Sequence, residues 1–169
     1  MKVLLAYDGR ERSKGILDEA ARMGEAVDRT VLLAVVSPGE TATRGDVAEE
    51  QTAGTTWEAH PVEAALAEAQ AHLRDHGVEA DAQLRFGDPV DVVADELARG
   101  GYDLLLVGTR LRGTLAEMLL GDVSRRLVER APCPVLVVGE EWTVRVDRRA
   151  PLHEEAGHVR LTSVGGMPA

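Results

Sequence analysis

The sequence predicts an α/β protein built on an open, doubly wound, five-stranded parallel sheet with helices on both faces. Short runs that are apolar throughout recur along the chain, as expected for strands that are covered on both sides. Segments with apolar residues at helical spacing lie between them, so strand and helix patterns alternate. Aromatic residues make up only 3% of the chain, so the core is expected to be aliphatic.

Five segments have the pattern of strands. Four are continuous apolar runs at Val3–Ala6, Val31–Val36, Leu104–Val107 and Val135–Val138. The fifth, Ala80–Phe86, alternates apolar with polar residues and is therefore placed at an edge of the sheet, with one face in water. The winding of such sheets gives the strand order 3-2-1-4-5, in which the first and fourth strands are neighbours.

Four segments have the pattern of helices. The first opens at Ser13, a candidate cap, and the second spans Pro61–His76. The third opens with Asp88 as the cap and Pro89 at the first helical position. The fourth spans Asp122–Arg130 and ends before two prolines.

Residues 1–139 hold these elements as one predicted domain, and two segments stand apart from the core pattern. Residues 37–60 are polar and longer than an ordinary connection, so we expect a mobile or functional insertion. Residues 140–169 form a C-terminal extension that we expect to be partly disordered. Within this extension, the stretch TVRV at 143–146 is a candidate for a short extra strand.

Charge and composition exclude several classes of function. The net charge of −10 argues against duplex nucleic acid and anionic membranes as partners. The single cysteine, Cys133, excludes an intrachain disulfide and a zinc site built from several thiolates. No apolar run has the length of a signal peptide core or a membrane span, so a soluble, cytoplasmic protein is expected.

Ligands of such sheets bind beyond the carboxyl ends of the strands, where the winding reverses. The first strand ends at Asp8 and the fourth at Gly108, so these two loops form the candidate crevice. The Asp8 carboxylate has two interpretations. It can hydrogen-bond a ribose or a base edge, or it can accept the amides of its own turn.

The second loop carries features of an anion site. Gly108 permits close approach of a ligand, and Thr109 offers a hydroxyl. Gly121 precedes a helix whose free N–H groups attract anions. Asp122, however, is a candidate N-cap that would accept the same N–H groups and repel a phosphate. Four nearby arginines are candidates to offset that charge: Arg110, Arg112, Arg125 and Arg126.

From Lys2 to Val138 the chain resembles the universal stress protein family. The resemblance is carried by VLLAYDG at 3–9, by GDPVDVVADELARGGYDLLLVGTR at 87–110 and by LLGDVSRRLVERAPCPVLVV at 119–138. Nucleotide-binding members share a pattern of Gly, two residues, Gly, nine residues, then Gly and Ser or Thr. Gly108 and Gly121 match it, whereas Leu111 and Asp122 depart from it. Ser124 offers a hydroxyl, but at a shifted position.

The resemblance implies a fold of the adenine-nucleotide alpha-hydrolase type and a stress-response role in which ATP or AMP, with Mg²⁺, is the candidate ligand. It assigns the nucleoside contact to Asp8 and the adenine contact to the backbone around Val35. The phosphate loop would comprise Gly108, Thr109, Arg110, Gly121, Asp122 and Val123. Family members that lack the motif bind no ATP, so an interaction protein without nucleotide is the alternative.

The resemblance also implies a homodimer formed by pairing of the last strand, Val135–Val138, and an unidentified protein partner. The alternative is that the C-terminal extension covers this edge within one chain. We expect no catalytic activity beyond a slow ATPase, because no general base or nucleophile pattern lies near the crevice. His72 and His76 have a metal-binding spacing, but a solvated helix end is the preferred interpretation, so no metal site is predicted.

Overall fold

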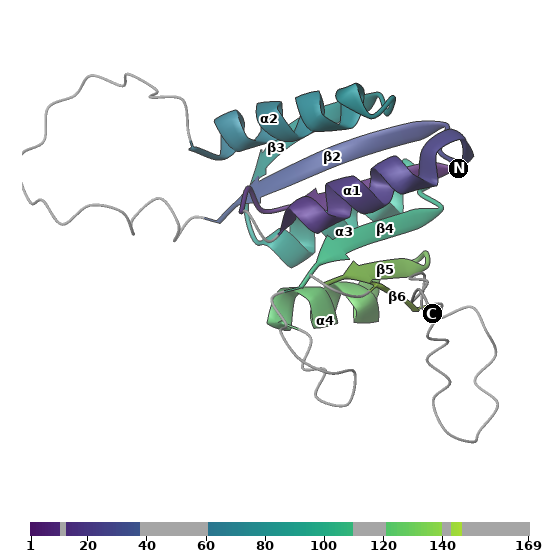
Figure 1. The fold of residues 1–169 in the computed structure, drawn as a ribbon. Coiled ribbons are helices and arrows are strands. Elements are labelled where there is room, and N and C mark those ends of the chain that lie inside the picture. The colour runs from purple at the N-terminus through teal and green to yellow at the C-terminus, as the bar shows by residue number, and fades with distance from the viewer. Residues whose placement is uncertain (11–12, 38–60, 110–120, 140–142, 147–169) are drawn as a thin grey trace, which may run out of the picture.

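The structure is a computed structural model that describes residues 1–10, 13–37, 61–109, 121–139 and 143–146 (Figure 1). Strands and helices alternate through most of the described chain, as predicted. The elements are β1 (Lys2–Tyr7), α1 (Lys14–Met23), the 3₁₀ turn η2 (Gly24–Ala26), β2 (Arg29–Val36), α2 (Pro61–Asp75), β3 (Ala80–Phe86), α3 (Pro89–Gly100), β4 (Leu104–Gly108), α4 (Asp122–Arg130), β5 (Val135–Val138) and β6 (Thr143–Val146).

One sheet runs through the described residues in the order β3-β2-β1-β4-β5-β6. The first five strands are parallel, which confirms the predicted order 3-2-1-4-5. Helices α1 and α2 cover one face of the sheet, and α3 and α4 cover the other (Figure 1). Strands β1 and β4 are neighbours, in register from Val3↔Leu104 to Ala6↔Val107, so their carboxyl ends meet at one edge.

Two apolar layers explain why the strands read as continuous hydrophobic runs. On β1, Val3 and Leu5 pack beneath α1 and α2, whereas Leu4 packs beneath α3 and α4. All three side chains are fully buried. A strand with helices on both faces must be apolar at every position, because neither face meets water.

Strand β3 lies at the edge, as its alternating pattern predicts. Ala80, Ala82 and Leu84 pack in part against the core beneath α2. Phe86 departs from this pattern, because its side chain is 60% exposed. It is the last residue of an edge strand, so it has a neighbouring strand on one side only.

The opposite edge differs from the prediction. Strand β6 pairs antiparallel with β5, from Val135↔Val146 to Val138↔Thr143. The stretch TVRV is therefore a sixth strand, and the prediction that Val135–Val138 is an open edge for homodimer pairing is wrong. The alternative, in which the C-terminal extension covers this edge, is confirmed. A homodimer stays a prediction, but the β5 edge is already occupied within the chain.

Candidate functional site

The candidate site lies where β1 and β4 end side by side. The chain leaves β1 through Asp8 and Gly9, whose positive φ of 74° allows the turn back toward α1. Gly108 ends β4 directly against the start of α1. A Cβ at Gly108 would lie 3.5 Å from the Ser13 hydroxyl oxygen, which is ordinary contact distance. The two predicted loops are therefore neighbours in space.

Asp8 stabilises its own turn. Its Oδ1 accepts a hydrogen bond from the Arg10 backbone N–H at 3.0 Å and another from the Ser13 hydroxyl. Its Oδ2 lies 3.9 Å from Arg10 Nε. The turn interpretation of Asp8 is thus what the structure shows. The side chain is nevertheless 46% exposed, which leaves the carboxylate accessible from solvent.

Ser13 was predicted to cap α1, and this is wrong for its side chain. Ser13 does occupy the N-cap position, but its hydroxyl makes no capping hydrogen bond. The hydroxyl donates to Asp8 instead. A hydrogen bond to a carboxylate is charge-assisted, so this contact fixes the Ser13 side chain toward the β1 turn.

Two hydroxyls flank the end of β4, and they differ in their partners. Ser124 on α4 donates to the Gly108 carbonyl oxygen at 3.0 Å and is buried. Its hydroxyl proton therefore helps to hold α4 against β4, and a contact of its oxygen with a ligand stays a prediction. The Thr109 backbone N–H donates to the Val138 carbonyl at 3.0 Å. Thr109 is only 5% exposed, yet its Oγ1 has no hydrogen-bond partner among the described residues.

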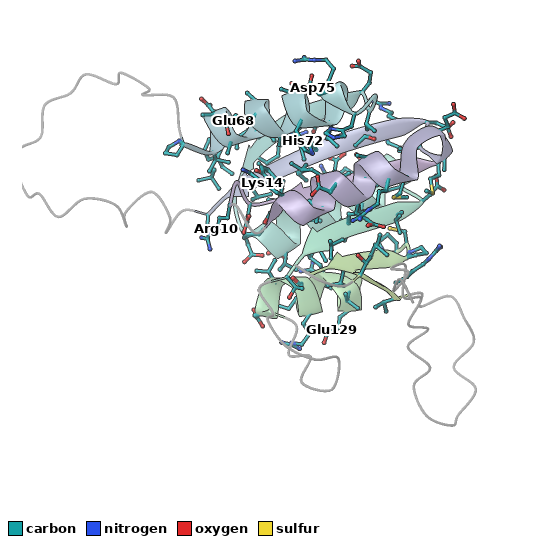
Figure 2. All side chains as sticks on the ribbon, in the orientation of Figure 1. Arg10, Lys14, Glu68, His72, Asp75 and Glu129 are labelled. Carbon is teal, nitrogen blue, oxygen red and sulfur yellow. The ribbon has the colours of Figure 1, made fainter. Side chains whose placement is uncertain are left out.

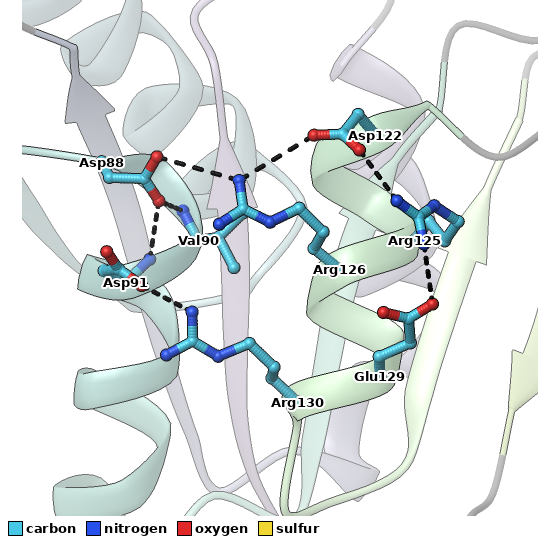
Figure 3. Close-up of polar contacts among 8 residues, drawn as sticks. All are labelled: Asp88, Val90, Asp91, Asp122, Arg125, Arg126, Glu129 and Arg130. Atoms are coloured by element: carbon cyan, nitrogen blue, oxygen red, sulfur yellow. Dashed lines mark hydrogen bonds and ion pairs between the residues drawn. The ribbon is translucent and has the colours of Figure 1, made fainter.

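The start of α4 contradicts the predicted role of Asp122. Gly121 is the N-cap, and Asp122 is the first helical residue. In the part of the chain that the structure describes, the first-turn N–H groups have no side-chain acceptor, so the Asp122 carboxylate does not cap the helix. Its oxygens turn along the helix surface instead, 3.0 Å from Arg125 and 3.8 Å from Arg126 (Figure 3). Arg125 and Arg126 thus offset the charge of Asp122, as the sequence analysis allowed. Arg110 and Arg112 lie outside the described residues.

Arg126 also joins the starts of two helices. Its Nη1 lies 3.9 Å from Oδ2 of Asp88, the cap of α3, and 3.8 Å from Asp122 (Figure 3). Asp88 accepts from the backbone N–H groups of Val90 and Asp91, which confirms its predicted capping role. The sequence analysis missed this bridge between α3 and α4. The spacing of Asp122 and Arg126, four residues apart on a helix, is the signal that indicates part of it.

Arg125 completes the local charge pattern. It bonds Asp122 at 3.0 Å and Glu129 at 2.9 Å. The hydrogen bond to Asp122 and the charge of Glu129 raise the pKa of Arg125 above its ordinary value. The start of α4 therefore carries one carboxylate that is matched by guanidinium groups rather than an isolated negative charge.

Val35 lies beside the crevice on β2. The Val36 carbonyl faces β3, because it accepts the Gly87 N–H at 3.0 Å. Backbone groups of successive strand residues point to opposite sides, so those of Val35 face β1. The last registered pair with β1 is Tyr7↔Ala34, one residue earlier. The backbone of Val35 is therefore directed at the end of β1, where Asp8 begins the turn.

The structure thus brings most of the predicted site residues to one end of the sheet. Asp8 follows β1, Gly108 is the last residue of β4, and Thr109 follows it. The Ser124–Gly108 hydrogen bond holds the start of α4 beside them. Val123, in the first turn of α4, is 43% exposed. Arg110 lies outside the described residues.

The remaining candidates belong to the fold rather than to a site. His72 projects from α2 toward α1 and its Nε2 lies 2.9 Å from Asp18 Oδ1 (Figure 2). The described residues contain no group of three His, Cys, Asp or Glu side chains that could hold a metal ion. Cys133 is buried, as predicted. In the same part of the chain, no helix has the length and apolar character needed to cross a membrane.

Comparison with known protein families decides the family. The sequence model described as the universal stress protein family matches residues 1–139. The chain belongs to the universal stress protein family. The match ends immediately after β5, so strand β6 lies beyond the part of the chain that the family description covers.

Individual members of the universal stress protein family support the assignment. A universal stress protein of Staphylococcus epidermidis is 29% identical over 141 residues, which cover 82% of this chain and 84% of the relative. Among solved structures, a universal stress protein in complex with cAMP has a TM-score of 0.60 at 20% identity, covering 82% of this chain and 96% of that one. The Archaeoglobus fulgidus universal stress protein in complex with dAMP has a TM-score of 0.57 at 20% identity, covering 81% and 96%. At this identity the structures show a shared fold.

Proposed function

We propose that this stress-response protein binds an adenine nucleotide, AMP or ATP, at the carboxyl ends of β1 and β4. In this proposal the phosphate meets the start of α4 and the nucleoside lies between Asp8 and the backbone of Val35. Occupancy of the site would then be read by a protein partner, as in other ligand-gated regulators. No catalytic step is part of the proposal.

The observation that carries the proposal is the start of α4, where no side chain of the described residues caps the helix. The first N–H groups of a helix have no partner within the helix, and they are normally met by a side chain, water or an anion. Among the described residues no side chain is seen to cap them, and Asp122 pairs with Arg125 and Arg126 instead. A phosphate would meet these N–H groups and the positive end of the helix dipole.

Thr109 supports the same location independently. Its hydroxyl is buried beside the Ser124–Gly108 contact and has no partner in the described part of the chain. Buried hydroxyls are normally hydrogen-bonded, so this oxygen suits a ligand acceptor. Gly121 adds room, because a Cβ there would meet nothing within 4 Å.

The known complexes of relatives with this fold point to the same ligand class. Two of them hold an adenine monophosphate, cAMP in one and dAMP in the other. For this chain, Asp8 is accessible to accept hydrogen bonds from a ribose, and the Val35 backbone is directed at the same place. Both features fit a nucleoside next to the proposed phosphate position.

A charge-matched pair of variants tests the proposed site. Val123→Glu adds one negative charge at an exposed position in the first turn of α4. Ala98→Glu adds the same charge on an exposed surface of α3, near Gly100, whose carbonyl contacts Lys2 at the opposite end of the sheet. Calorimetric titration with AMP and with ATP, with and without Mg²⁺, should show affinity lowered about threefold or more by Val123→Glu. Ala98→Glu should leave it unchanged.

Two outcomes would contradict the proposal. Equal effects of the two variants would mean that any nucleotide binds elsewhere. Absence of binding by the unmodified chain would favour the alternative, a universal stress protein that acts through protein contacts without a nucleotide.

A further inference from the structure

Strand β3 ends the sheet with a long edge that pairs with β2 on one side only, among the described strands. It comprises Ala80–Phe86, seven residues, whereas β6 at the opposite end has four. The outer side of an edge strand presents a row of unpaired backbone N–H and C=O groups to another chain. β3 therefore offers the longer of the two edges for pairing.

The contact with β2 shows which backbone groups of β3 point outward. Gly87 donates its N–H to the Val36 carbonyl at 3.0 Å, so its backbone groups face β2. Backbone groups alternate in direction along a strand, so those of Phe86 face away from β2. The same alternation gives an outward row of four residues: Ala80, Ala82, Leu84 and Phe86.

The side chains on one face of β3 form a charged row. Asp81, Gln83 and Arg85 alternate with the apolar residues and therefore share this face. Arg85 donates to the Gln83 side chain and Gln83 donates to Asp81, at 3.0 Å each. Asp81 and Arg85 are both exposed. The row thus runs from a negative charge through a neutral centre to a positive charge.

We propose that β3 is an interface at which a second copy of this chain adds its own β3, antiparallel and across a two-fold axis at Gln83. Two identical strands that meet across such an axis bury the same surface on both copies. With the axis at Gln83, Asp81 of each copy lies opposite Arg85 of the other. Directly opposite side chains of unlike charge stabilise an antiparallel pair, whereas like charges destabilise it. Displacing the axis by one residue would place Asp81 opposite Gln83 or Gly87 and break both pairs.

The outward backbone groups match in the same register. The axis at Gln83 sets Ala82 opposite Leu84, and it sets the two ends of the strand, Ala80 and Phe86, opposite each other. Outward residues thus meet outward residues, as the hydrogen-bonded pairs of an antiparallel ladder require. The Phe86 side chain is 60% exposed in the single chain. In the pair it lies beside the small Ala80 side chain of the second copy, which leaves room for the ring.

Helix α2 covers the apolar face of β3, and its outer flank carries charges in a similar order (Figure 1). Gln70 lies on this flank, because its side-chain amide donates to the outward carbonyl of Ala80 at 2.7 Å. Glu63 and Arg74, seven residues before and four residues after Gln70, share its side of the helix. Both side chains are exposed.

The lengths of α2 and β3 bring the charges of α2 level with each other across the axis. Helix α2 ends shortly before β3 begins and runs back along it. Its fifteen residues and the seven residues of β3 both span about 23 Å, so the middle of α2 lies level with Gln83. The axis then places Glu63 of each copy level with Arg74 of the other. Charges on β3 and on α2 thus both favour a second copy as the partner of this edge.

Two charge-reversal variants of the full chain test the proposal. Asp81→Arg sets like charges opposite each other at Arg85 of the second copy, and Arg85→Asp does so at Asp81. Mixed in equal amounts, the two variants bring opposite charges together again at both positions. They change the net charge in opposite directions, so overall charge cannot account for a loss that they share. Arg22→Glu, which reverses an exposed charge on α1, is the control.

Sedimentation velocity over a wide range of chain concentration measures the association of the 18.2 kDa chain. We expect the unmodified chain and the Arg22→Glu control to associate alike. Each β3 variant alone should raise the dissociation constant about tenfold or more, because two attractive pairs become repulsive. The equimolar mixture of the two β3 variants should recover most of this loss.

Three outcomes would overturn the proposal. An unmodified chain that stays monomeric at every concentration would show that β3 takes no second copy. Association that neither β3 variant weakens would place the interface on another surface. A mixture that fails to recover the association would show that the loss does not come from complementary charges.

Discussion

Removal of the Asp122 charge should strengthen nucleotide binding. The Asp122 carboxylate sits at the first position of α4, and its pairs with Arg125 and Arg126 are exposed. Asp122→Ser removes the charge and restores the hydroxyl of the family pattern. Asp122→Asn removes the charge alone, so comparison of the two separates the electrostatic effect from the hydroxyl.

The size of the effect follows from distance and solvent. A phosphate on the first-turn N–H groups of α4 would lie roughly 6 Å, about one helical turn, from the Asp122 carboxylate. In the water-like dielectric of an exposed site, each unit of phosphate charge then lowers affinity about threefold. AMP should therefore bind about three- to tenfold more tightly to both variants, since released Arg125 and Arg126 can also approach the phosphate. Added salt should reduce the gain.

Calorimetric titration with AMP at low and at physiological salt measures this change. The electrostatic reasoning fails if Asp122→Asn leaves the affinity for AMP unchanged at low salt. A gain in Asp122→Ser alone would assign the effect to the hydroxyl. In that case the charge of Asp122 is already cancelled by its two arginines.

Two further predictions concern stability. Gly100→Ala should lower the free energy of unfolding by about 2 kcal/mol, because the new Cβ would lie 2.1 Å from Cε2 of the buried Tyr102 ring. Gly15→Ala is the control, because its Cβ would lie 3.4 Å from Val138, which is ordinary contact distance. Equal denaturant midpoints for the two variants would refute the predicted clash. Burial and the hydrogen bond to Glu96 raise the pKa of Tyr102 above its ordinary value. The protonated Tyr102 side chain therefore contributes to the free energy of unfolding below about pH 10. This contribution is lost as the pH rises further and the hydroxyl ionises. Denaturation from pH 8 to about pH 11 should show a steeper decline for the unmodified chain than for Tyr102→Phe, and parallel declines would contradict this.

The order of the strands and the edge position of Ala80–Phe86 could be predicted from the sequence, because apolar periodicity reports directly which faces meet water. The cap at Asp88 was equally accessible, since Pro89 after a capping residue leaves little choice of conformation. These features depend on residues that are close in the chain.

The errors share a different physical origin. The sequence predicted Ser13 and Asp122 as capping side chains, but the Ser13 hydroxyl donates to Asp8 and the Asp122 carboxylate pairs with Arg125. A side chain at the start of a helix can hydrogen-bond with several donors and acceptors, and the conformation of the neighbouring turn decides which of these bonds forms. The β5 edge was misjudged because β6 pairs with it from outside the family domain, and a four-residue strand gives only a weak periodic signal.

The most direct test of the proposed nucleotide site uses protein purified without added nucleotide. The protein is denatured, and the supernatant is chromatographed for ATP, ADP and AMP, while a second sample is heated with and without added AMP or ATP and Mg²⁺. The proposed site predicts a released adenine nucleotide, or a raised unfolding midpoint when nucleotide is added. A supernatant without adenine nucleotide, together with an unchanged unfolding midpoint, would contradict the proposed site. It would show that the start of α4 holds no nucleotide.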